Sequence, residues 1–438
     1  MKEISGWGRY PVVRAEEREA EDLESASAGA ALSRGLGRSY GDASLPAHGA
    51  ALCTRRADRI LAFDPDSGVL RAEAGLSLRA LNVIFPARGW ASPVSPGTQY
   101  VTLGGMVASD VHGKNHHVAG CFGEYVRALR MRVGDGRVLE IDEASEPDLF
   151  RATLGGMGLT GHILEVEVQL ERIPSFWIRG RSERVGDLEE LLGALAAASS
   201  RSPFAAAWVD TTARGAALGR GIVTSGRYAE AHEAPASPPQ LRERFAVPFD
   251  LPGWFVGPWS IRAFNTLYFH GYRANAVEHV IHPQPFFYPL DQVRDWNRLY
   301  GRRGMVQYQC VIPTHADPAT FRRLLEVVSR LGGASPVSVI KDCGSQGRGT
   351  LSFPMAGMSL ALDLPYRVGR TETLVDALNQ IVVAARGRIY LTKDALTRRD
   401  HFAAMEPRLA RWNEVRRKWD PERKLSSALA QRLLDPTP

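Results

Sequence analysis

The sequence predicts an α+β protein of at least two domains, and three observations lead to this class. The chain has 438 residues, more than a single hydrophobic core usually serves. Of these residues 44% are hydrophobic and 23% are charged, as in an ordinary globular protein. Short strand-like and helical stretches alternate over the first 175 residues, and a different pattern follows them.

Each element predicted in residues 1–175 has its own local signal. Strands are expected at residues 69–74, 126–133, 137–141 and 164–170, and a helix at residues 77–85. Pro86 ends that helix, and Gly134-Asp135-Gly136 between two β-rich runs is typical of a hairpin. From residue 164 to 170 apolar and polar side chains alternate, as in a half-buried strand.

The remainder of the chain predicts a second domain over residues 176–387 and a return to the first domain over 388–438. Helices are expected at residues 187–199, 319–331, 372–385 and 402–419, and strands at residues 306–312, 338–341, 359–364 and 388–391. The stretch 226–254 is rich in proline and charge, so we expect a long mobile loop there.

Charge and targeting signals narrow the class of partner. The formal net charge of +6 is a mild bias, and no Lys/Arg tract with interleaved aromatic residues occurs, so no nucleic-acid partner is expected. The four cysteines are far apart and form no metal or disulfide pattern. No signal peptide and no membrane-spanning stretch is evident, which indicates a cytoplasmic protein and leaves peripheral contact with the inner membrane face open.

Three glycine-rich segments point to a cofactor. They cover residues 33–42, 95–117 and 154–163. Glycine lets the backbone approach a ligand closely, and successive N–H groups can bind an anion. The spacing in the first segment matches neither the dinucleotide fingerprint nor a Walker loop. Three such loops in one domain indicate an extended, phosphate-bearing cofactor.

The histidine cluster of the second segment is a candidate metal site. His112, His116 and His117 are potential ligands, since imidazole is the commonest metal ligand in proteins. However, no Asp or Glu follows at ligand spacing, and Lys114 would repel a cation. We therefore expect no metal site.

Read together, these segments resemble a known family. The motifs are G-L-G-R-S-Y-G-D from Gly35, V-T-L-G-G-M-V-A-S-D-V-H-G-K-N-H-H from Val101, and L-G-G-M-G-L-T-G from Leu154. They resemble the vanillyl-alcohol oxidase (PCMH) type of FAD-binding domain and, within it, the decaprenylphosphoryl-β-D-ribose 2-oxidase family. The likeness continues at residues 307–313, 351–354, 387–394 and 416–421. It implies an FAD-binding domain with an inserted α+β substrate domain that contains an antiparallel sheet.

The resemblance also implies which positions bind FAD. They are Ser33, Arg34, Gly35, Leu36, Gly37, Arg38, Ser39, Tyr40, Gly41, Asp42, Ala43, Gly97, Thr102, Leu103, Gly104, Gly105, Ser109, Asp110, Val111, His112, Ile163 and Tyr390. Many relatives attach the flavin covalently through a histidine, at the position that Asp42 occupies here. Ser109 stands in the loop where a second attachment, through cysteine, would need a thiol. We therefore expect non-covalent FAD.

The implied reaction is oxidation of the 2-hydroxyl of a polyprenyl-phosphate pentose to the 2-keto sugar, with hydride transfer to flavin N5. An NAD(P)H-dependent short-chain reductase would complete an epimerisation that supplies cell-wall arabinan precursors. The catalytic positions are Lys393, His112 and Tyr40. Lys393 and His112 are the two candidate bases, and Tyr40 is expected to contact the flavin.

Substrate-binding positions implied by the resemblance are Gln307, Gln309, Lys341, Ser359 and Lys393. Two departures from the family are evident: Ala361 stands where well-known members have a cysteine, and Ser359 where they have an asparagine.

The sequence leaves three alternatives to this function open. A flavin oxidase of a soluble alditol or aldonolactone could use the same scaffold. A metal hydrolase could use the histidine cluster, and a binding protein could retain the fold without activity.

Overall fold

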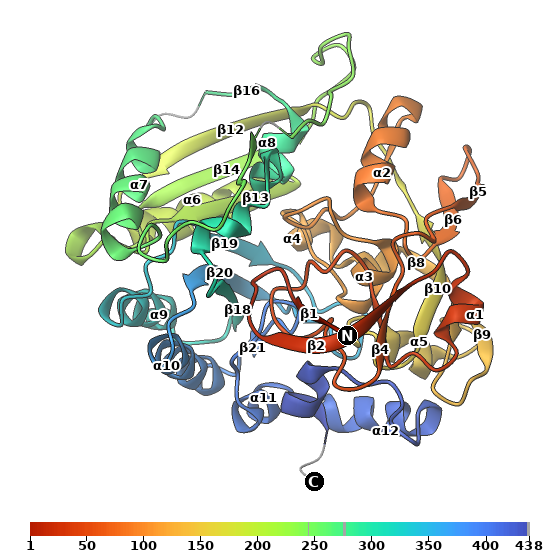
Figure 1. Ribbon diagram of the computed structural model, residues 1–438. Coiled ribbons are helices and arrows are strands. Elements are labelled where there is room, and N and C mark those ends of the chain that lie inside the picture. The colour runs from red at the N-terminus through yellow and green to blue at the C-terminus, as the bar shows by residue number, and fades with distance from the viewer. Residues whose placement is uncertain (244, 275–276, 436–438) are drawn as a thin grey trace.

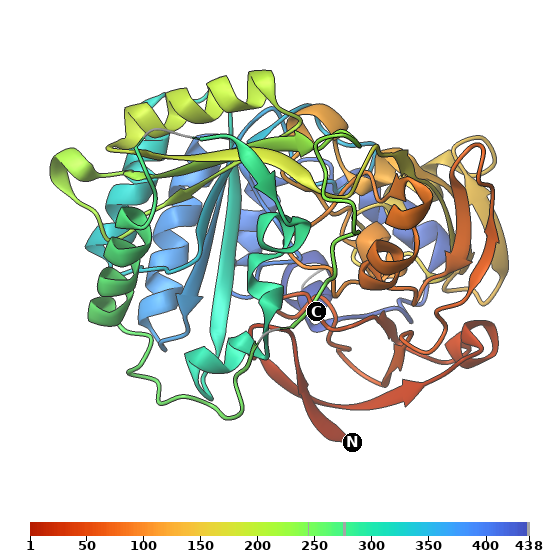
Figure 2. The same ribbon diagram turned by 90° about the horizontal axis from the view of Figure 1, so that it is seen from above.

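The computed structural model describes residues 1–243, 245–274 and 277–435, so residue 244 of the predicted loop and residues 436–438 of the predicted C-terminal segment lie outside it. The fold is α+β, with one part formed mainly by the N-terminal third and a larger sheet beside it (Figures 1 and 2). Among the described residues, no helix combines the length and the apolar character that crossing a bilayer requires.

Two larger sheets form most of the N-terminal part. The first has the order β1 (Lys2–Ser5), β2 (Val12–Glu19), β4 (Ala50–Cys53), β3 (Leu32–Arg34), and the second the order β5 (Ile60–Phe63), β6 (Val69–Glu73), β10 (His162–Gln169), β8 (Val126–Arg132), β9 (Val138–Asp142). The predicted hairpin is confirmed, because β8 and β9 pair antiparallel from Arg132 opposite Val138. Gly136 in its turn has a φ of 95°, which favours glycine.

The helices of this part are short. They are α1 (Leu23–Ser27), α2 (Leu78–Ile84), α3 (Leu103–Ala108), α4 (His116–Ala119) and α5 (Pro147–Thr153). Helix α2 begins where the sequence predicts, since the Ser77 hydroxyl accepts the backbone N–H of Ala80 at 3.1 Å. It ends before Pro86, as expected.

An eight-stranded sheet dominates the second part. Its order is β16 (His279–Ile281), β12 (Ile178–Val185), β14 (Gly221–Tyr228), β13 (Phe204–Val209), β19 (Ser338–Cys343), β20 (Gly357–Pro365), β18 (Met305–Pro313), β21 (Arg388–Ile389). All of its neighbouring strands pair antiparallel. The domain division stays a prediction; its boundary at residue 387 falls just before β21, which pairs with β18.

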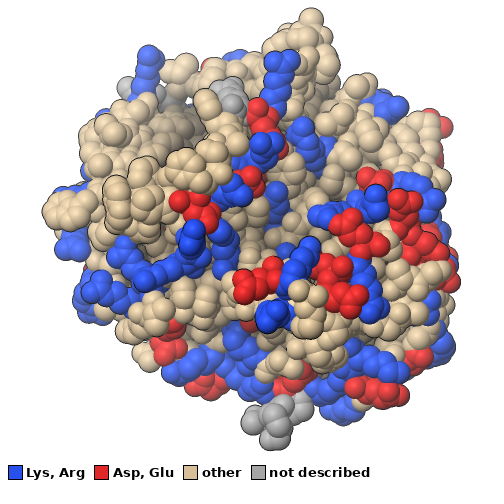
Figure 3. All heavy atoms as spheres, in the orientation of Figure 1, with Lys and Arg blue, Asp and Glu red and all other residues tan. Residues whose placement is uncertain are grey.

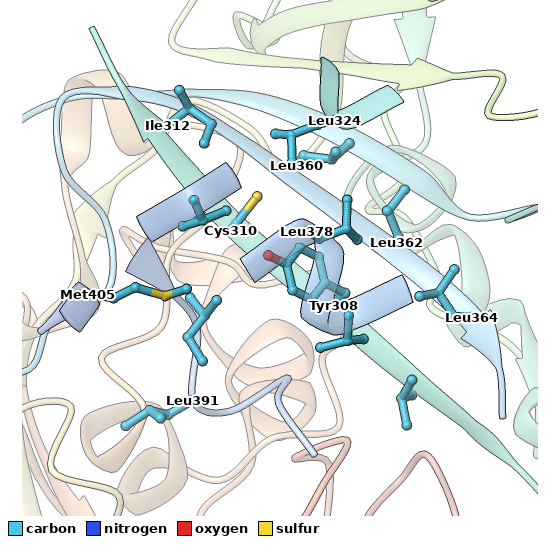
Figure 4. Packing of buried hydrophobic residues seen from close by; sticks show 14 of the residues in the cluster. Tyr308, Cys310, Ile312, Leu324, Leu360, Leu362, Leu364, Leu378, Leu391 and Met405 are labelled. Carbon is cyan, nitrogen blue, oxygen red and sulfur yellow. The ribbon is translucent and has the colours of Figure 1, made fainter. Parts of the chain in front are cut away.

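Helices cover one face of the large sheet. They are α6 (Leu188–Arg201), α9 (Ala319–Arg330) and α10 (Arg370–Ala384) (Figure 1). Figure 4 shows Tyr308, Cys310 and Ile312 of β18 packed with leucines of β20, α9 and α10. Replacing a leucine such as Leu360, which is fully buried, with alanine would cost about 2–5 kcal/mol of stability.

The remaining strands and α-helices lie outside these sheets' main strands and covering helices. They are β7 (Trp90–Ala91), β11 (Glu171–Arg172), β15 (Phe245–Ala246), β17 (Val293–Arg294), α7 (Pro258–His270), α8 (Pro283–Phe287), α11 (Arg399–Met405) and α12 (Leu409–Trp419).

The single helix predicted over residues 402–419 is wrong, because α11 and α12 are separate helices. Pro407 lies between them, and the residue before a proline avoids the helical region of φ and ψ. Glu406 accordingly has φ −126° and ψ 77°.

The predicted loop 226–254 begins later than expected, because β14 continues to Tyr228. The loop contacts both parts of the molecule. Arg9 near the N-terminus donates two hydrogen bonds to Asp250, at 2.6 and 3.0 Å. The side chain of Gln284, beside the large sheet, both accepts from and donates to the backbone of Arg242, at 2.8 Å each.

Candidate active site

A cavity of about 930 Å³ lies between the two parts of the molecule. The three glycine-rich segments line one side, and the face of the large sheet that α6, α9 and α10 leave uncovered lines the other. This volume is near the upper end of the range of about 300–1,000 Å³ typical of small-molecule and cofactor sites. The cavity is therefore large enough for a cofactor and a substrate group together.

Free backbone donors characterise the first glycine loop. The N–H groups of residues 36–39 donate no hydrogen bond to any other residue that the structure describes, and all four residues line the cavity. Gly37 has a left-handed φ of 63°, and space is open where a Cβ on the cavity-lining Gly97 would stand. Successive unpaired N–H groups at a concave surface suit the phosphates of a dinucleotide cofactor such as FAD.

The second glycine segment packs closely against the first. The Thr102 hydroxyl caps α3 by accepting the backbone N–H of Gly105 at 3.2 Å. A Cβ on Gly35 would come within 2.4 Å of that hydroxyl, so a side chain there would separate the two loops. The Tyr390 hydroxyl donates to the carbonyl of Ser109 at 2.8 Å and so connects the far end of the chain to this wall.

Most positions predicted to bind FAD line the cavity. They are Ser33, Gly35, Leu36, Gly37, Arg38, Ser39, Tyr40, Ala43, Gly97, Thr102, Gly104, Gly105, Ser109, Val111, His112, Ile163 and Tyr390. The cavity wall does not include Arg34, Gly41, Asp42, Leu103 and Asp110.

Asp42 binds within the protein instead. Its two carboxylate oxygens accept hydrogen bonds from Arg432, at 2.8 Å each, and Arg432 also lies 2.8 Å from Asp394. Asp42 is 3% exposed. At the position of the flavin-linking histidine of many relatives, this chain thus has Asp42 in a buried ion pair. The pair connects the first glycine loop to Arg432 of the C-terminal segment.

On the substrate side of the cavity, the alternation of side chains along β18 and β20 decides which residues face the cavity. Because side chains alternate between the two faces of a strand, Gln307 and Gln309 point opposite to Tyr308 and Cys310. Gln307, Gln309 and, on β20, Ala361 line the cavity, whereas the predicted Ser359 does not. The two glutamines are 8% and 4% exposed, so they do not form a solvated face.

Lys393 lies beside Tyr40 at the meeting point of the two sides. Its Nζ is 4.2 Å from the centre of the Tyr40 ring, and its backbone N–H donates to the Tyr390 carbonyl at 2.9 Å. Burial lowers the pKa of Lys393, and the negative charge of Asp363 partly offsets this lowering. Burial in turn raises the pKa of Asp363, whose carboxylate accepts a hydrogen bond from Gln307.

His112 is held at both ring nitrogens. Its Nε2 is 3.0 Å from the Gln309 amide nitrogen, and its Nδ1 is 3.3 Å from Nζ of Lys341. Its ring lies beside those of Tyr390 and Phe353, with centroids 5.4 and 5.6 Å away. Burial, reinforced by the charge of Lys341, lowers the pKa of His112 well below its usual value, so the ring is neutral.

Two further side chains of the site were missed in the sequence. Lys114 lines the cavity with its Nζ 4.8 Å from the centre of the Phe286 ring, and Asp363 lies behind Gln307. Burial lowers the pKa of Lys114, and likewise that of Lys341, to about 8. Lys114 was visible two residues after His112, and Asp363 two residues after Ala361 on the same strand face.

The side chains of the histidine cluster do not point to one common site. His117 donates from Nε2 to the carbonyl of Ser202 at 3.1 Å, whereas His116 Nδ1 accepts the backbone N–H of Gly344 at 3.1 Å. Within the described part of the chain, no three His, Cys, Asp or Glu side chains are grouped so that they could hold a metal ion.

Comparison with known proteins gives a consistent assignment. Residues 25–142 match the family described as FAD binding domain. The chain is 32% identical to decaprenylphosphoryl-β-D-ribose oxidase of Mycolicibacterium smegmatis over 99% of its length and 97% of that protein. It is 35% identical to an uncharacterised protein of Streptomyces coelicolor over 81% of its length and 98% of that protein. Mouse L-gulonolactone oxidase is 33% identical, over only 27% of the chain and 26% of that protein.

The cofactor of this chain is FAD, and the free donors of the first glycine loop and the large cavity suit it. The match to the Mycolicibacterium enzyme extends through the residues of both sides of the cavity. The chain belongs to the decaprenylphosphoryl-β-D-ribose oxidase family of FAD-dependent oxidoreductases.

Proposed function

We propose that the chain oxidises the 2-hydroxyl of a polyprenyl-phosphate pentose of the decaprenylphosphoryl-β-D-ribose type to the 2-keto sugar. The cationic lining of the cavity carries this proposal. Of the described residues, five cationic side chains line the cavity, Arg38, Lys114, Arg273, Lys341 and Lys393, against one carboxylate, Asp291. Lys114 and Lys341 suit a phosphate, and Gln307 and Gln309 beside them suit sugar hydroxyls. Ser359, outside the wall, is the weakest of the proposed substrate contacts.

Oxidation of an alcohol needs a group that takes the hydroxyl proton. Bound FAD supplies the acceptor for the hydride that leaves the carbon. We assign the proton to Nζ of Lys393, because its lowered pKa leaves part of the side chain neutral near physiological pH. The carboxylate of Asp363 balances the charge that Lys393 gains.

Tyr40 and His112 have different roles in this proposal. Burial raises the pKa of the Tyr40 phenol well above its usual value, so Tyr40 stays protonated and positions Lys393 by ring contact. Both nitrogens of His112 are already engaged, with Gln309 and Lys341. His112 therefore orients these two substrate-binding side chains rather than acting as the base.

The product implies a second enzyme. The 2-keto sugar becomes the alcohol with inverted configuration at C2 only when a reductant delivers hydride to C2 on the face opposite to the one from which hydride left. We infer that an NAD(P)H-dependent short-chain reductase supplies it, so that the pair acts as an epimerase for a cell-wall arabinan precursor. Since a polyprenyl tail is insoluble in water, we also infer peripheral contact with the cytoplasmic face of the inner membrane.

Anaerobic stopped-flow spectroscopy tests the proposed function. Decaprenylphosphoryl ribose should bleach the flavin absorbance of the purified protein, and free ribose, an alditol and an aldonolactone should not. Bleaching by the soluble sugars alone would favour the alternative of a soluble-sugar oxidase. The likeness to L-gulonolactone oxidase covers too little of the chain to support that alternative.

A further inference from the structure

Exposed apolar side chains are concentrated in one segment. Of the 17 large hydrophobic residues that are exposed in the described part of the chain, nine lie between residues 245 and 277. The most exposed are Trp259 at 83%, Trp254 at 77% and Leu267 at 76%. Single exposed apolar residues are ordinary, but several on one helix and the loop before it indicate an interaction surface.

Four of these nine residues, Trp259, Phe264, Leu267 and Tyr268, lie on helix α7. Its inner face is narrow and consists of Ile261, Asn265 and Phe269, which are buried. The Asn265 amide donates to Asp210 at 2.8 Å and fixes the helix on the large sheet. Trp259 and Leu267, which are two turns apart, therefore face solvent, with Phe264 on the same side of the helix.

The border of this face is basic. Residues 251–274 include Arg262, His270 and Arg273 but no Asp or Glu. Arg302 and Arg303 follow Gly301, where an added Cβ would stand 2.7 Å from the carbonyl oxygen of Leu251 and 3.5 Å from Gly253. Among the described residues, no carboxylate lies within 4.0 Å of the charged groups of Arg262, Arg302 and Arg303. Figure 3 shows the surface over α7, at the upper left, as mainly uncharged, with Lys and Arg along its lower border.

The exposed face continues into the cavity. Phe264 and Tyr268 stack with ring centroids 5.8 Å apart, and both line the cavity wall. Tyr268 also contacts Trp208 on the large sheet, with centroids 4.9 Å apart. Phe264 and Tyr268 therefore belong both to the exposed face of α7 and to the cavity wall.

We propose that the α7 surface, defined as Trp254, Phe255, Trp259, Phe264 and Leu267 with Arg262, Arg302 and Arg303, docks on an anionic phospholipid bilayer. Aromatic side chains suit the headgroup level, and a basic border suits anionic lipid. The inference rests on the proposed function in one respect, that the substrate carries a lipid tail. Docking through α7 would place the part of the cavity wall that Phe264 and Tyr268 form beside the membrane, where such a tail resides.

Vesicle sedimentation of the FAD-loaded protein, without substrate, tests the docking surface. The wild type should bind vesicles of phosphatidylcholine with phosphatidylglycerol and bind pure phosphatidylcholine less. Trp259→Gln/Leu267→Gln should lower partitioning by about tenfold or more, since each substitution removes a large apolar side chain from the interface. Val83→Gln/Leu61→Gln, exposed apolar residues outside the α7 surface, is the matched control and should bind as the wild type does.

Three outcomes would overturn the inference: no binding to either vesicle, equal binding by the α7 variant, or a dimer in solution that the α7 variant dissociates. Quenching of tryptophan emission by brominated lipid gives a second readout, and it should fall in Trp259→Phe. Because these assays contain no substrate, they can fail while substrate still bleaches the flavin. Failure of bleaching with intact vesicle binding would instead contradict the proposed function.

Discussion

The two sides of the cavity are built in different ways. The FAD side consists of contiguous loops, in which the unpaired backbone N–H groups of residues 36–39 are the proposed recognition elements. The substrate side consists of single side chains from separate strands and loops, Gln307, Gln309, Lys341 and Lys393. Backbone recognition tolerates few changes of conformation but many of side chain, whereas the substrate side can change specificity one residue at a time.

Replacing Lys393 should distinguish the functions of the two sides most clearly, because it should affect flavin reduction and not FAD binding. In Lys393→Met, flavin reduction by substrate should slow about 10²–10⁴-fold, because the base is lost, while the flavin content stays unchanged. Stopped-flow bleaching and the visible spectrum measure the two effects. Lys424→Met, whose side chain is 55% exposed, is the control. Undiminished reduction would remove Lys393 from the proposed mechanism.

A bulky residue in the first glycine loop should instead weaken FAD binding. Gly37→Val places a β-branched residue at a φ of 63°, with its Cβ 2.6 Å from the Arg34 guanidinium. We expect FAD affinity to fall about tenfold to hundredfold, as measured by fluorescence titration. Gly29→Val has the same backbone strain at a φ of 78° with open space around it, and should retain FAD. Equal losses in both variants would indicate general destabilisation instead.

The pH dependence of flavin reduction reports on the lysines. Under the proposed mechanism neutral Lys393 is the reactive form, so reduction should rise with pH by up to about tenfold per pH unit. Burial lowers the pKa of Lys393, so this limb should lie below the ordinary lysine value of about 10.4. Above about pH 8, Lys114 and Lys341 lose their charge and KM should increase. A rate that does not change with pH would exclude Lys393 as the base.

Lys114 should affect binding more than chemistry. In Lys114→Met we expect KM to increase about tenfold, because a charge-assisted hydrogen bond to phosphate is worth about 1.5–3 kcal/mol. The value of kcat should change little. Lys418→Met, at an exposed site, is the control. An unchanged KM would place the phosphate elsewhere in the cavity.

Ala361 should give the smallest effect on turnover. Ala361→Cys restores the thiol of well-known family members on the cavity wall, and turnover should stay within about twofold because the change in volume is small. Mass spectrometry should show that an inhibitor that traps that cysteine labels the variant and leaves the wild type unmodified. Ala206→Cys, another cavity-lining position, controls for general thiol reactivity. Labelling of the wild type would contradict this expectation.

Much of the FAD side could be predicted because its signals are local. The hairpin at Gly134-Asp135-Gly136 and the helix between Ser77 and Pro86 follow from neighbouring residues alone. The substrate side was harder to predict. Alternation along one strand does not say which face is buried, so Gln307 and Gln309 could equally have been solvated. Asp363 was missed for the same reason, and Pro407 was overlooked as a helix breaker.

The sequence by itself determined the α+β class, the glycine loops, the FAD cofactor and the family, because these depend on contiguous motifs and short-range backbone preferences. Only the tertiary structure decided that Asp42 pairs with Arg432, that His112 is held between Gln309 and Lys341, and that Lys393 meets Tyr40. These contacts join residues up to 390 positions apart. The burial that shifts the pKa values of His112, Lys341, Lys393 and Tyr40 exists only after the two parts of the chain have packed together.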